Sequence, residues 1–299
     1  MERKLIYLIN PISGTKNKEG ILDIIRERTE QYNITYEILP TNPAGDYIYL
    51  KDKIIAEDIT DVIICGGDGT VNQVAQALLG VAVSIGIIPL GSGNGLAFTV
   101  KVPANINKAL DIVLTGNASF IDAFLINGCF SCLLSGLGFD ALVAHDFATE
   151  GKRGLATYIK KSFCHFFKVS PYRFEFINKG IAFSTDAYFI SIANGNQFGN
   201  HVTIAPKASL SDGLLDIVIV KKMNKIKLVL SALIQTFFGE VMEYEEKNFH
   251  SSDVFYFQTD QLVINNPSLA PLHIDGEPAQ TSHKLEIEII KHAFKLIHP

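Results

Sequence analysis

The alternation of apolar and polar positions divides the chain into two regions with different predicted architecture. Up to about residue 118, short apolar runs that predict strands alternate with stretches whose apolar residues recur at helical spacing. The predicted strands are 4–10, 34–39, 61–65 and 84–88, and the predicted helices are 17–30, 46–56 and one that runs from Thr70. This βαβα order predicts a parallel sheet with helices on both faces.

From about Ser119 onward, apolar residues alternate with polar ones at the period of a strand. The predicted strands are 120–126, 131–137, 172–177, 187–193, 215–220, 254–258, 262–265 and 285–290, with helices near 155–167 and 226–238. Consecutive strands without intervening helices predict an antiparallel sandwich. We therefore predict an α/β fold, with a doubly wound parallel-sheet domain over 1–118 and a β-sandwich domain over 119–290.

Composition and charge narrow the class of protein. A chain of 299 residues, 47% hydrophobic and 19% charged, is globular and long enough for two domains. The formal net charge of -5 argues against a dedicated nucleic-acid binder, which needs excess Lys and Arg to neutralise phosphates. No uninterrupted apolar run reaches the length that spans a bilayer, so a cytoplasmic location is expected.

The cysteines and histidines do not predict a metal site. Cys129 and Cys132 have a Cys-x-x-Cys spacing, but they lie in a segment, 129–134, that reads as a strand. Positions three apart on a strand point to opposite faces, so we expect buried thiols. Four histidines show no ligand spacing and are expected to be ordinary surface or core residues: His145, His165, His201 and His273.

The sequence Gly66-Gly67-Asp68-Gly69-Thr70 lies between a predicted buried strand and a predicted helix. Glycines at such a turn let backbone N–H groups approach a ligand closely, because no Cβ stands in the way. A helix N-terminus with exposed amides favours an anion, most often a phosphate. A bare carboxylate beside a phosphate is repulsive, so the carboxylate inside the turn indicates that the site also binds a metal ion or transfers a proton. This combination predicts nucleotide chemistry.

Other loops follow neighbouring predicted strands and should lie at the same sheet edge, where α/β proteins bind ligands. They are Asn10-Pro11-Ile12-Ser13-Gly14, the residue Thr41, and the glycine-rich segment 89–97, in which Ser92 and Asn94 offer hydrogen-bond donors. The chain contains no P-loop signature and no dinucleotide-binding G-x-G-x-x-G with a downstream acidic partner.

With these motifs the chain resembles the diacylglycerol kinase catalytic family, which includes bacterial lipid kinases, sphingosine kinases and ceramide kinases. The resemblance is carried by NPISG at 10–14, GGDGT at 66–70 and GSGNGLA at 91–97, and it continues through GFDA at 138–141, SDGLLD at 211–216 and DGEP at 275–278. It implies an ATP- and Mg²⁺-dependent lipid kinase with its active site in the cleft between the two domains. It also implies that the C-terminal segment 291–299 returns to the nucleotide domain.

The resemblance also implies roles for individual residues. The residues that would contact ATP are Asn10, Ser13, Thr41, Gly66, Gly67, Gly69, Thr70 and Ser92. Glu277 would accept the proton of the lipid hydroxyl, with Asp275 beside it, and Asp68 would hold the catalytic magnesium or help to activate the hydroxyl. Asp212 would bind a second, structural magnesium together with the backbone carbonyls of Ser209 and Leu214. From the residues alone, Asp275-Gly276-Glu277 and Ser211-Asp212-Gly213 also read as simple turns.

The lipid substrate is left open. Gly95 and Phe98 stand where many bacterial diacylglycerol kinases carry Asp and Arg, and the small residue at 95 resembles sphingosine and ceramide kinases more closely. Residues 152–168 form a predicted amphipathic helix that either contacts the membrane transiently or packs on its own domain. Two other functions stay open: an NAD kinase-like enzyme, which shares the GGDGT turn, and a catalytically silent regulator that binds lipid or nucleotide.

Overall fold

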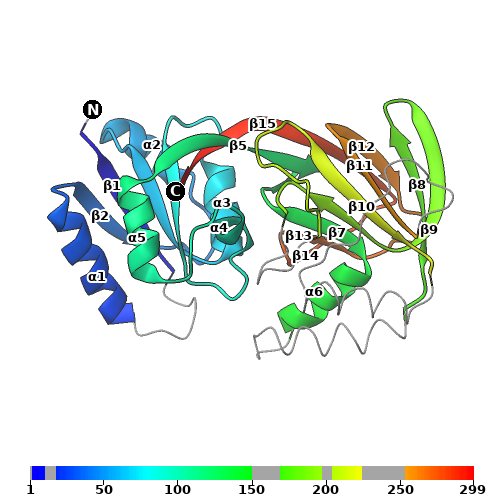
Figure 1. The fold of residues 1–299 in the computed structure, drawn as a ribbon, viewed down its shortest axis with the longest axis horizontal. Helices are drawn as coiled ribbons and strands as arrows, with labels where there is room; N and C mark the ends of the chain where they lie inside the picture. The colour runs from blue at the N-terminus through cyan, green and yellow to red at the C-terminus, as the bar shows by residue number, and fades with distance from the viewer. Residues whose placement is uncertain (1, 11–17, 150–168, 197–203, 224–252) are drawn as a thin grey trace. The chain divides into compact units, whose positions relative to one another are not determined.

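The computed structural model describes residues 2–10, 18–149, 169–196, 204–223 and 253–299. The chain divides into two compact units. The first unit comprises Met1–Asp122 and Lys291–Pro299, and the second comprises Ala123–Ile290. Two long strands belong partly to each unit: β5 (Asn117–Ile126) and β15 (Lys284–His298) (Figure 1).

The first unit is built on a parallel sheet. Its strands are β1 (Lys4–Ile9), β2 (Thr35–Pro40), β3 (Asp61–Gly66), β4 (Ser84–Pro89) and the C-terminal part of β15. They lie in the order β2-β1-β3-β4-β15, and β15 pairs in parallel with β4 through Lys295 opposite Ser84 and Leu296 opposite Ile85. Strands β1 and β3 are almost wholly buried, as expected for a parallel sheet that is covered on both faces.

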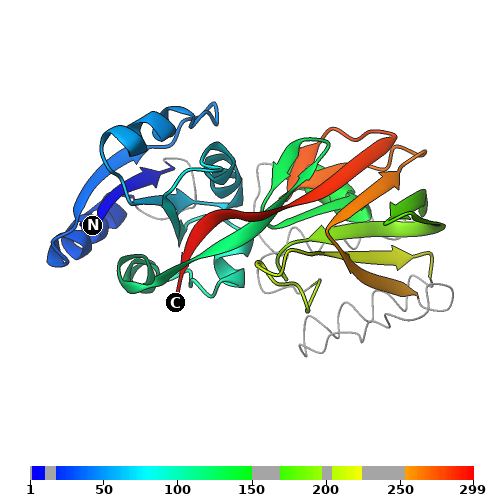
Figure 2. The same ribbon diagram turned by 90° about the horizontal axis from the view of Figure 1, so that it is seen from above.

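Helices cover both faces of this sheet. They are α1 (Lys18–Gln31), α2 (Tyr49–Ala56), α3 (Asp68–Ala77), the short α4 (Gly95–Thr99) and α5 (Ile106–Thr115). Ile21 and Ile25 of α1 pack with Val113 of α5 against one face, in a cluster that includes Tyr7 and Ile63. Figure 2 shows α1 and α5 on one side of the strands and α2 and α3 on the other. The predicted doubly wound arrangement is confirmed.

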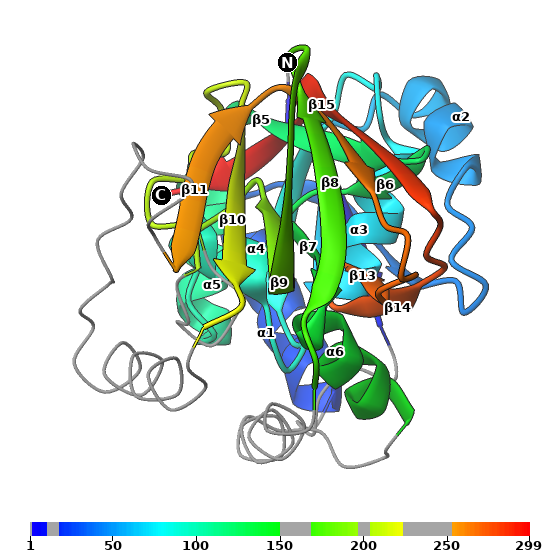
Figure 3. The ribbon, with the colours of Figure 1, turned by 90° about the vertical axis from the view of Figure 1, so that its right-hand side faces the viewer.

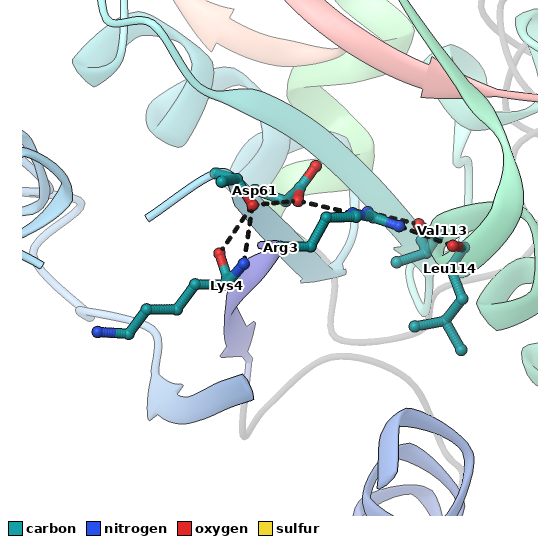
Figure 4. A network of polar contacts seen from close by, with 6 residues as sticks. Arg3, Lys4, Asp61, Val113 and Leu114 are labelled. Atoms are coloured by element: carbon teal, nitrogen blue, oxygen red, sulfur yellow. Dashed lines mark hydrogen bonds and ion pairs between the residues drawn. The ribbon is translucent and has the colours of Figure 1, made fainter. Parts of the chain in front are cut away.

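A polar network closes the amino-terminal edge of this sheet (Figure 4). Arg3 donates from Nε to Asp61 Oδ2 at 3.1 Å, and its two terminal nitrogens donate to the carbonyls of Leu114 (2.6 Å) and Val113 (3.0 Å). Thr60 Oγ1 donates to the same Asp61 oxygen at 2.6 Å. The two carbonyls belong to the last turn of α5, where no intrahelical donor remains, so one guanidinium caps a helix and neutralises a buried carboxylate.

We expect Arg3→Gln to lower the free energy of unfolding by about 1–3 kcal/mol, because Asp61 would lose its counter-charge while its side chain is only 8% exposed. Chemical denaturation measures this change. The matched control is Arg26→Gln, whose ion pair with Asp23 is solvent-exposed and should contribute less than about 0.5 kcal/mol. Equal effects of the two variants would contradict the assigned role of Arg3.

The second unit is an antiparallel assembly. Its strands, besides the parts of β5 and β15, are β6 (Cys129–Ser131), β7 (Leu134–Gly138), β8 (Tyr172–Asn178), β9 (Ile181–Ala193), β10 (Leu215–Lys221), β11 (Val254–Thr259), β12 (Gln261–Asn265), β13 (Leu272–Ile274) and β14 (Glu277–Ala279). Figure 3 shows β11, β10, β9 and β8 side by side, in agreement with their antiparallel pairing. The predicted antiparallel β-sandwich is confirmed.

The core of the second unit consists of the inward faces of these strands. Phe124, Phe176 and Ile190 belong to one buried cluster with the alternate residues of β10, β12 and β15. Helix α6 (Phe139–Thr149) follows β7 directly and contacts β7, β13 and β14. These contacts matter for the site, because β13 and β14 carry the acidic turn that the sequence analysis singled out.

Several predicted boundaries differ from the structure for local physical reasons. Helix α2 begins at Tyr49 and not at Asp46, because Asp46 Oδ1 accepts from the N–H of Ile48 and holds a turn instead of a helix. The last strand continues to His298, well beyond the predicted end at Ile290. The predicted strand 131–137 is interrupted at Cys132 and Leu133, for a reason given with the site.

Two predicted helices, 155–167 and 226–238, lie outside the described residues, as does the whole of the proposed membrane-contact segment 152–168. In the described part of the chain, no helix combines the length and the apolar character needed to cross a membrane.

Candidate functional site

The polar loops of the first unit meet at the carboxyl ends of its parallel strands. Asn10 directly follows β1, and its Nδ2 donates to Thr70 Oγ1 at 3.1 Å in the first turn of α3. Thr41 directly follows β2, and its N–H donates to the carbonyl of Ile9 at 3.0 Å. Three residues that the sequence analysis assigned to ATP therefore lie on one edge of the sheet.

The two glycine-rich loops pack backbone against backbone. A Cβ placed on Gly91 would lie 2.5 Å from the Cα of Gly67, and a Cβ on Gly67 would lie 3.1 Å from the Cα of Gly91. Both distances are below ordinary van der Waals contact. The glycines are therefore required by the approach of the two loops, which brings the amides after β3 and β4 to one place.

Asp68 projects toward the second of these loops. A Cβ on Gly93 would lie 2.9 Å from Asp68 Oδ2, and the N–H of Leu96 lies 3.5 Å from Asp68 Oδ1. Asp68 is half-buried and opens α3, with Gly67 as its N-cap. The predicted start of this helix at Thr70 is wrong by two residues, because Asp68 and Gly69 already have helical backbone. Asp68 thus lies where the helix dipole favours negative charge, beside amides that can hold a phosphate.

Asn94 holds the second glycine-rich loop in its conformation, a role that the sequence does not reveal. It adopts a left-handed backbone with φ 54°, its Oδ1 accepts from Gly91 N at 2.9 Å, and its Nδ2 donates to Gly91 O at 2.8 Å. It is buried, whereas Ser92 at the tip of the same loop is exposed. Asn94 therefore stabilises the fold of the loop, and Ser92 is an exposed residue of the loop that carries a hydroxyl. Ser13 lies outside the described residues.

The acidic motif of the second unit is a two-residue hairpin turn. Asp275 (φ 48°) and Gly276 (φ 85°) connect β13 to β14, and both positive φ values are those of the turn that best matches strand twist. The turn reading of the sequence is confirmed. Glu277 opens β14 and is exposed, so its carboxylate is available to solvent or to a substrate.

Asp275 is engaged by the backbone of a neighbouring segment. Its Oδ1 accepts from Ser131 Oγ (2.6 Å), Leu133 N (3.2 Å) and Leu134 N (3.0 Å), and its Oδ2 accepts from Cys132 N (3.0 Å). Ser131 in turn accepts from Ser135 Oγ at 3.1 Å. These contacts make Asp275 the anchor of the turn.

The same contacts explain why the predicted strand 131–137 is interrupted at Cys132 and Leu133. The amides of Cys132, Leu133 and Leu134 point to a carboxylate, so the strand is broken between β6 and β7. Cys129 is exposed, and the prediction that both cysteines of the pair are buried is wrong for it. Cys132 is buried as expected. Among the described residues, no group of three or more His, Cys, Asp or Glu side chains could hold a metal ion.

The Ser209–Leu214 loop precedes β10. Asp212 is exposed, and its Oδ1 accepts from Leu214 N at 3.0 Å, which is the turn that the residue pattern also allowed. Gly213 takes φ 73°. A carboxylate and two backbone carbonyls within six residues offer the oxygen ligands that Mg²⁺ accepts, so the loop fits a hard cation that completes its shell with water.

Three buried polar residues in the second unit were not foreseen as important. Burial raises the pKa of Asp216, and hydrogen bonds from Tyr256 and Gln258 oppose this rise. His273 and Asp140 are 2% and 6% exposed and form a pair with His273 Nε2 3.3 Å from Asp140 Oδ2. Asp140 is in the quoted GFDA motif, but no short-range spacing in the sequence could reveal its partner, which is 133 positions away.

Comparisons with known proteins agree with this arrangement. The diacylglycerol kinase catalytic domain matches residues 4–126, and the YegS C-terminal NAD kinase beta sandwich-like domain matches residues 135–298. The protein named "Probable lipid kinase YegS" from Escherichia fergusonii is 30% identical over 259 residues, which cover 84% of this chain and 82% of that protein. The diacylglycerol kinase of Bacillus subtilis is 26% identical over 279 residues, which cover 92% and 89%.

A crystal structure of a diacylglycerol kinase from Bacillus anthracis has the same fold, with a TM-score of 0.75 at 20% identity, and the match covers 100% of this chain and 97% of that one. The family of this chain is shown by the domain match over residues 135–298 and by the 30% identity to a YegS protein. The chain belongs to the YegS-like family of lipid kinases, with an N-terminal diacylglycerol kinase catalytic domain, and it is an enzyme of the lipid kinase class.

Proposed function

We propose that this enzyme transfers the γ-phosphate of ATP, with Mg²⁺, to a hydroxyl of a membrane lipid of the diacylglycerol, phosphatidylglycerol or sphingoid/ceramide type. The proposal that ATP is the phosphate donor is supported by the convergence of two glycine-rich loops at the N-terminus of α3. A phosphate chain needs closely spaced N–H groups and no intervening side chains, and this edge of the sheet supplies both.

The acceptor chemistry rests on Glu277. Phosphoryl transfer requires an oriented hydroxyl and a group that takes its proton. Glu277 is exposed at the first position of β14, directly after a turn that Asp275 anchors, so its carboxylate is the acidic group of the motif that can meet a hydroxyl. Mg²⁺, when bound, neutralises charge on the phosphates. Asp68 would hold it in the first unit, and Asp212 with the carbonyls of Ser209 and Leu214 would hold a structural ion in the second.

The test is transfer of labelled γ-phosphate from ATP to lipids in mixed micelles with Mg²⁺. Diacylglycerol, monoacylglycerol, phosphatidylglycerol, sphingosine and ceramide are assayed in parallel with NAD. Label on one of the lipids supports the proposal and identifies the substrate class. Label on NAD alone would replace it with an NAD kinase-like activity. Nucleotide binding without transfer to any acceptor would replace it with a regulatory role.

We expect Gly91→Ala to weaken ATP binding by at least about tenfold, because the added Cβ would lie 2.5 Å from Gly67 Cα and must push the two loops apart. Isothermal titration of ATP into the protein measures the effect. Gly20→Ala is the control, since nothing lies within 4 Å of its added Cβ. Unchanged ATP affinity in Gly91→Ala would show that the nucleotide does not use this pair of loops.

A further inference from the structure

His273 is bonded on both sides of its ring, at the base of the acidic turn. Its Nδ1 accepts from the N–H of Gly276 at 3.2 Å, and its Nε2 lies 3.3 Å from Asp140 Oδ2. Both side chains of this pair are almost completely buried, at 3% and 6% exposure. The imidazole therefore links the first turn of α6 to the backbone of the turn that precedes Glu277.

The hydrogen bonds determine the tautomer. A backbone N–H can donate to Nδ1 only if that nitrogen carries a lone pair, so the proton of the neutral ring is on Nε2. From Nε2 it is donated to the Asp140 carboxylate. Asp140 is itself oriented, because its Oδ1 accepts from Ala141 N at 2.8 Å. The carboxylate thus favours the tautomer of the ring that can accept the hydrogen bond from Gly276.

The neighbouring strand leaves space for this pair. Gly136 of β7 lies opposite His273 in the ladder, and a Cβ there would lie 2.0 Å from Asp140 Oδ2 and 2.8 Å from His273 Nε2. Any other residue at 136 would displace one of the two partners. The local structure of β7, α6 and β13 is therefore built around the contact between Asp140 and His273.

The turn is consequently held from two directions. Asp275 is fixed by the amides of Cys132, Leu133 and Leu134, and Gly276 is fixed by His273. Glu277 is the next residue in the chain and has an exposed side chain. With both turn residues held, the backbone from which the Glu277 carboxylate projects has little freedom to move.

We propose that His273, kept in its Nε2–H tautomer by Asp140, is a positioning residue for Glu277. The inference rests on the proposed role of Glu277 as the proton acceptor. A misplacement of a reacting group by about 1 Å costs on the order of a hundredfold in rate. Loss of the Nδ1 contact should therefore lower kcat and leave the KM for ATP unchanged, since the ATP residues belong to the first unit.

The experiment compares two variants of His273 in which an amide side chain can take the place of only one of the two ring nitrogens. In His273→Asn the side-chain oxygen can take the place of Nδ1 and accept from Gly276, whereas in His273→Gln the side-chain NH₂ can take the place of Nε2 and donate to Asp140. We expect His273→Gln to lose about a hundredfold in kcat and His273→Asn to retain activity within about tenfold of wild type. His283→Gln, at an exposed histidine, is the control.

A second measurement does not depend on activity. Exchange of the Gly276 amide proton, followed by NMR on ¹⁵N-labelled protein, should be slow in wild type and His273→Asn and fast in His273→Gln. Thermal unfolding confirms that each variant is folded. Equal kcat in the two variants, or Gly276 exchange that His273→Gln does not change, would overturn the proposal. If wild type transfers no phosphate to any lipid, the proposed function fails, and the exchange data alone decide whether His273 holds the turn.

Discussion

Replacing Glu277 by Gln should lower kcat for phosphate transfer by about 10²- to 10⁴-fold, the contribution of a general base. The amide has nearly the shape of the carboxylate but cannot take the proton of the attacking hydroxyl. Because Glu277 is exposed, the free energy of unfolding should stay within about 0.5 kcal/mol of wild type. Steady-state transfer assays and urea denaturation measure the two quantities on the same preparations.

The KM for ATP should also stay unchanged in Glu277→Gln, since nucleotide contacts are assigned to the first unit. Glu175→Gln, an exposed carboxylate on β8 of the same unit, is the matched control and should leave kcat unchanged. A Glu277→Gln enzyme with more than about a tenth of wild-type kcat would show that another group accepts the proton.

In contrast to Glu277→Gln, the Asp275→Asn substitution should greatly lower the free energy of unfolding. Its carboxylate accepts from three backbone amides and one hydroxyl, and an amide NH₂ placed at Oδ2 would face the N–H of Cys132. Two donors then oppose each other beside residues that are at most 5% exposed. The free energy of unfolding should fall by about 3 kcal/mol, in the range measured for charged hydrogen bonds and buried unsatisfied groups.

Urea denaturation of Asp275→Asn beside Glu277→Gln provides an internal comparison, because the two substitutions are two residues apart and chemically alike. Asp275→Asn should also lose transfer activity, since the turn that carries Glu277 loses its anchor. If Asp275→Asn unfolds at the same urea concentration as wild type, the anchoring role is wrong and a direct catalytic role for Asp275 regains support.

The sequence pattern was sufficient for features that depend on local periodicity. Strands β1, β2, β3 and β4 were predicted to within one residue at each end, because buried parallel strands are short apolar runs bounded by glycine and polar turns. The loops after β1, β2, β3 and β4 could be placed on one edge from strand order alone. The ATP and magnesium assignments of individual residues stay predictions.

Features that depend on contacts distant in sequence could not be predicted in this way. The break between β6 and β7 is caused by Asp275, more than 140 positions away, and the buried pair of Asp140 and His273 joins residues 133 positions apart. The hydrogen bonds of the Asn94 side chain to Gly91 form in a left-handed backbone conformation that the sequence does not reveal, and the assignment of Asn94 to the nucleotide stays a prediction. In each case a polar side chain satisfies a distant or irregular backbone group.

In the proposed reaction, phosphate passes from ATP to a lipid hydroxyl on this enzyme. The most direct measurement follows ³²P from γ-labelled ATP into the organic phase after extraction, with wild type, Glu277→Gln and wild type with excess EDTA. We expect Mg²⁺-dependent label in a single lipid product with wild type, and at least about a hundredfold less label with Glu277→Gln. Label that stays entirely in the aqueous phase with folded wild type that binds ATP, although every lipid class is offered, would contradict this reaction.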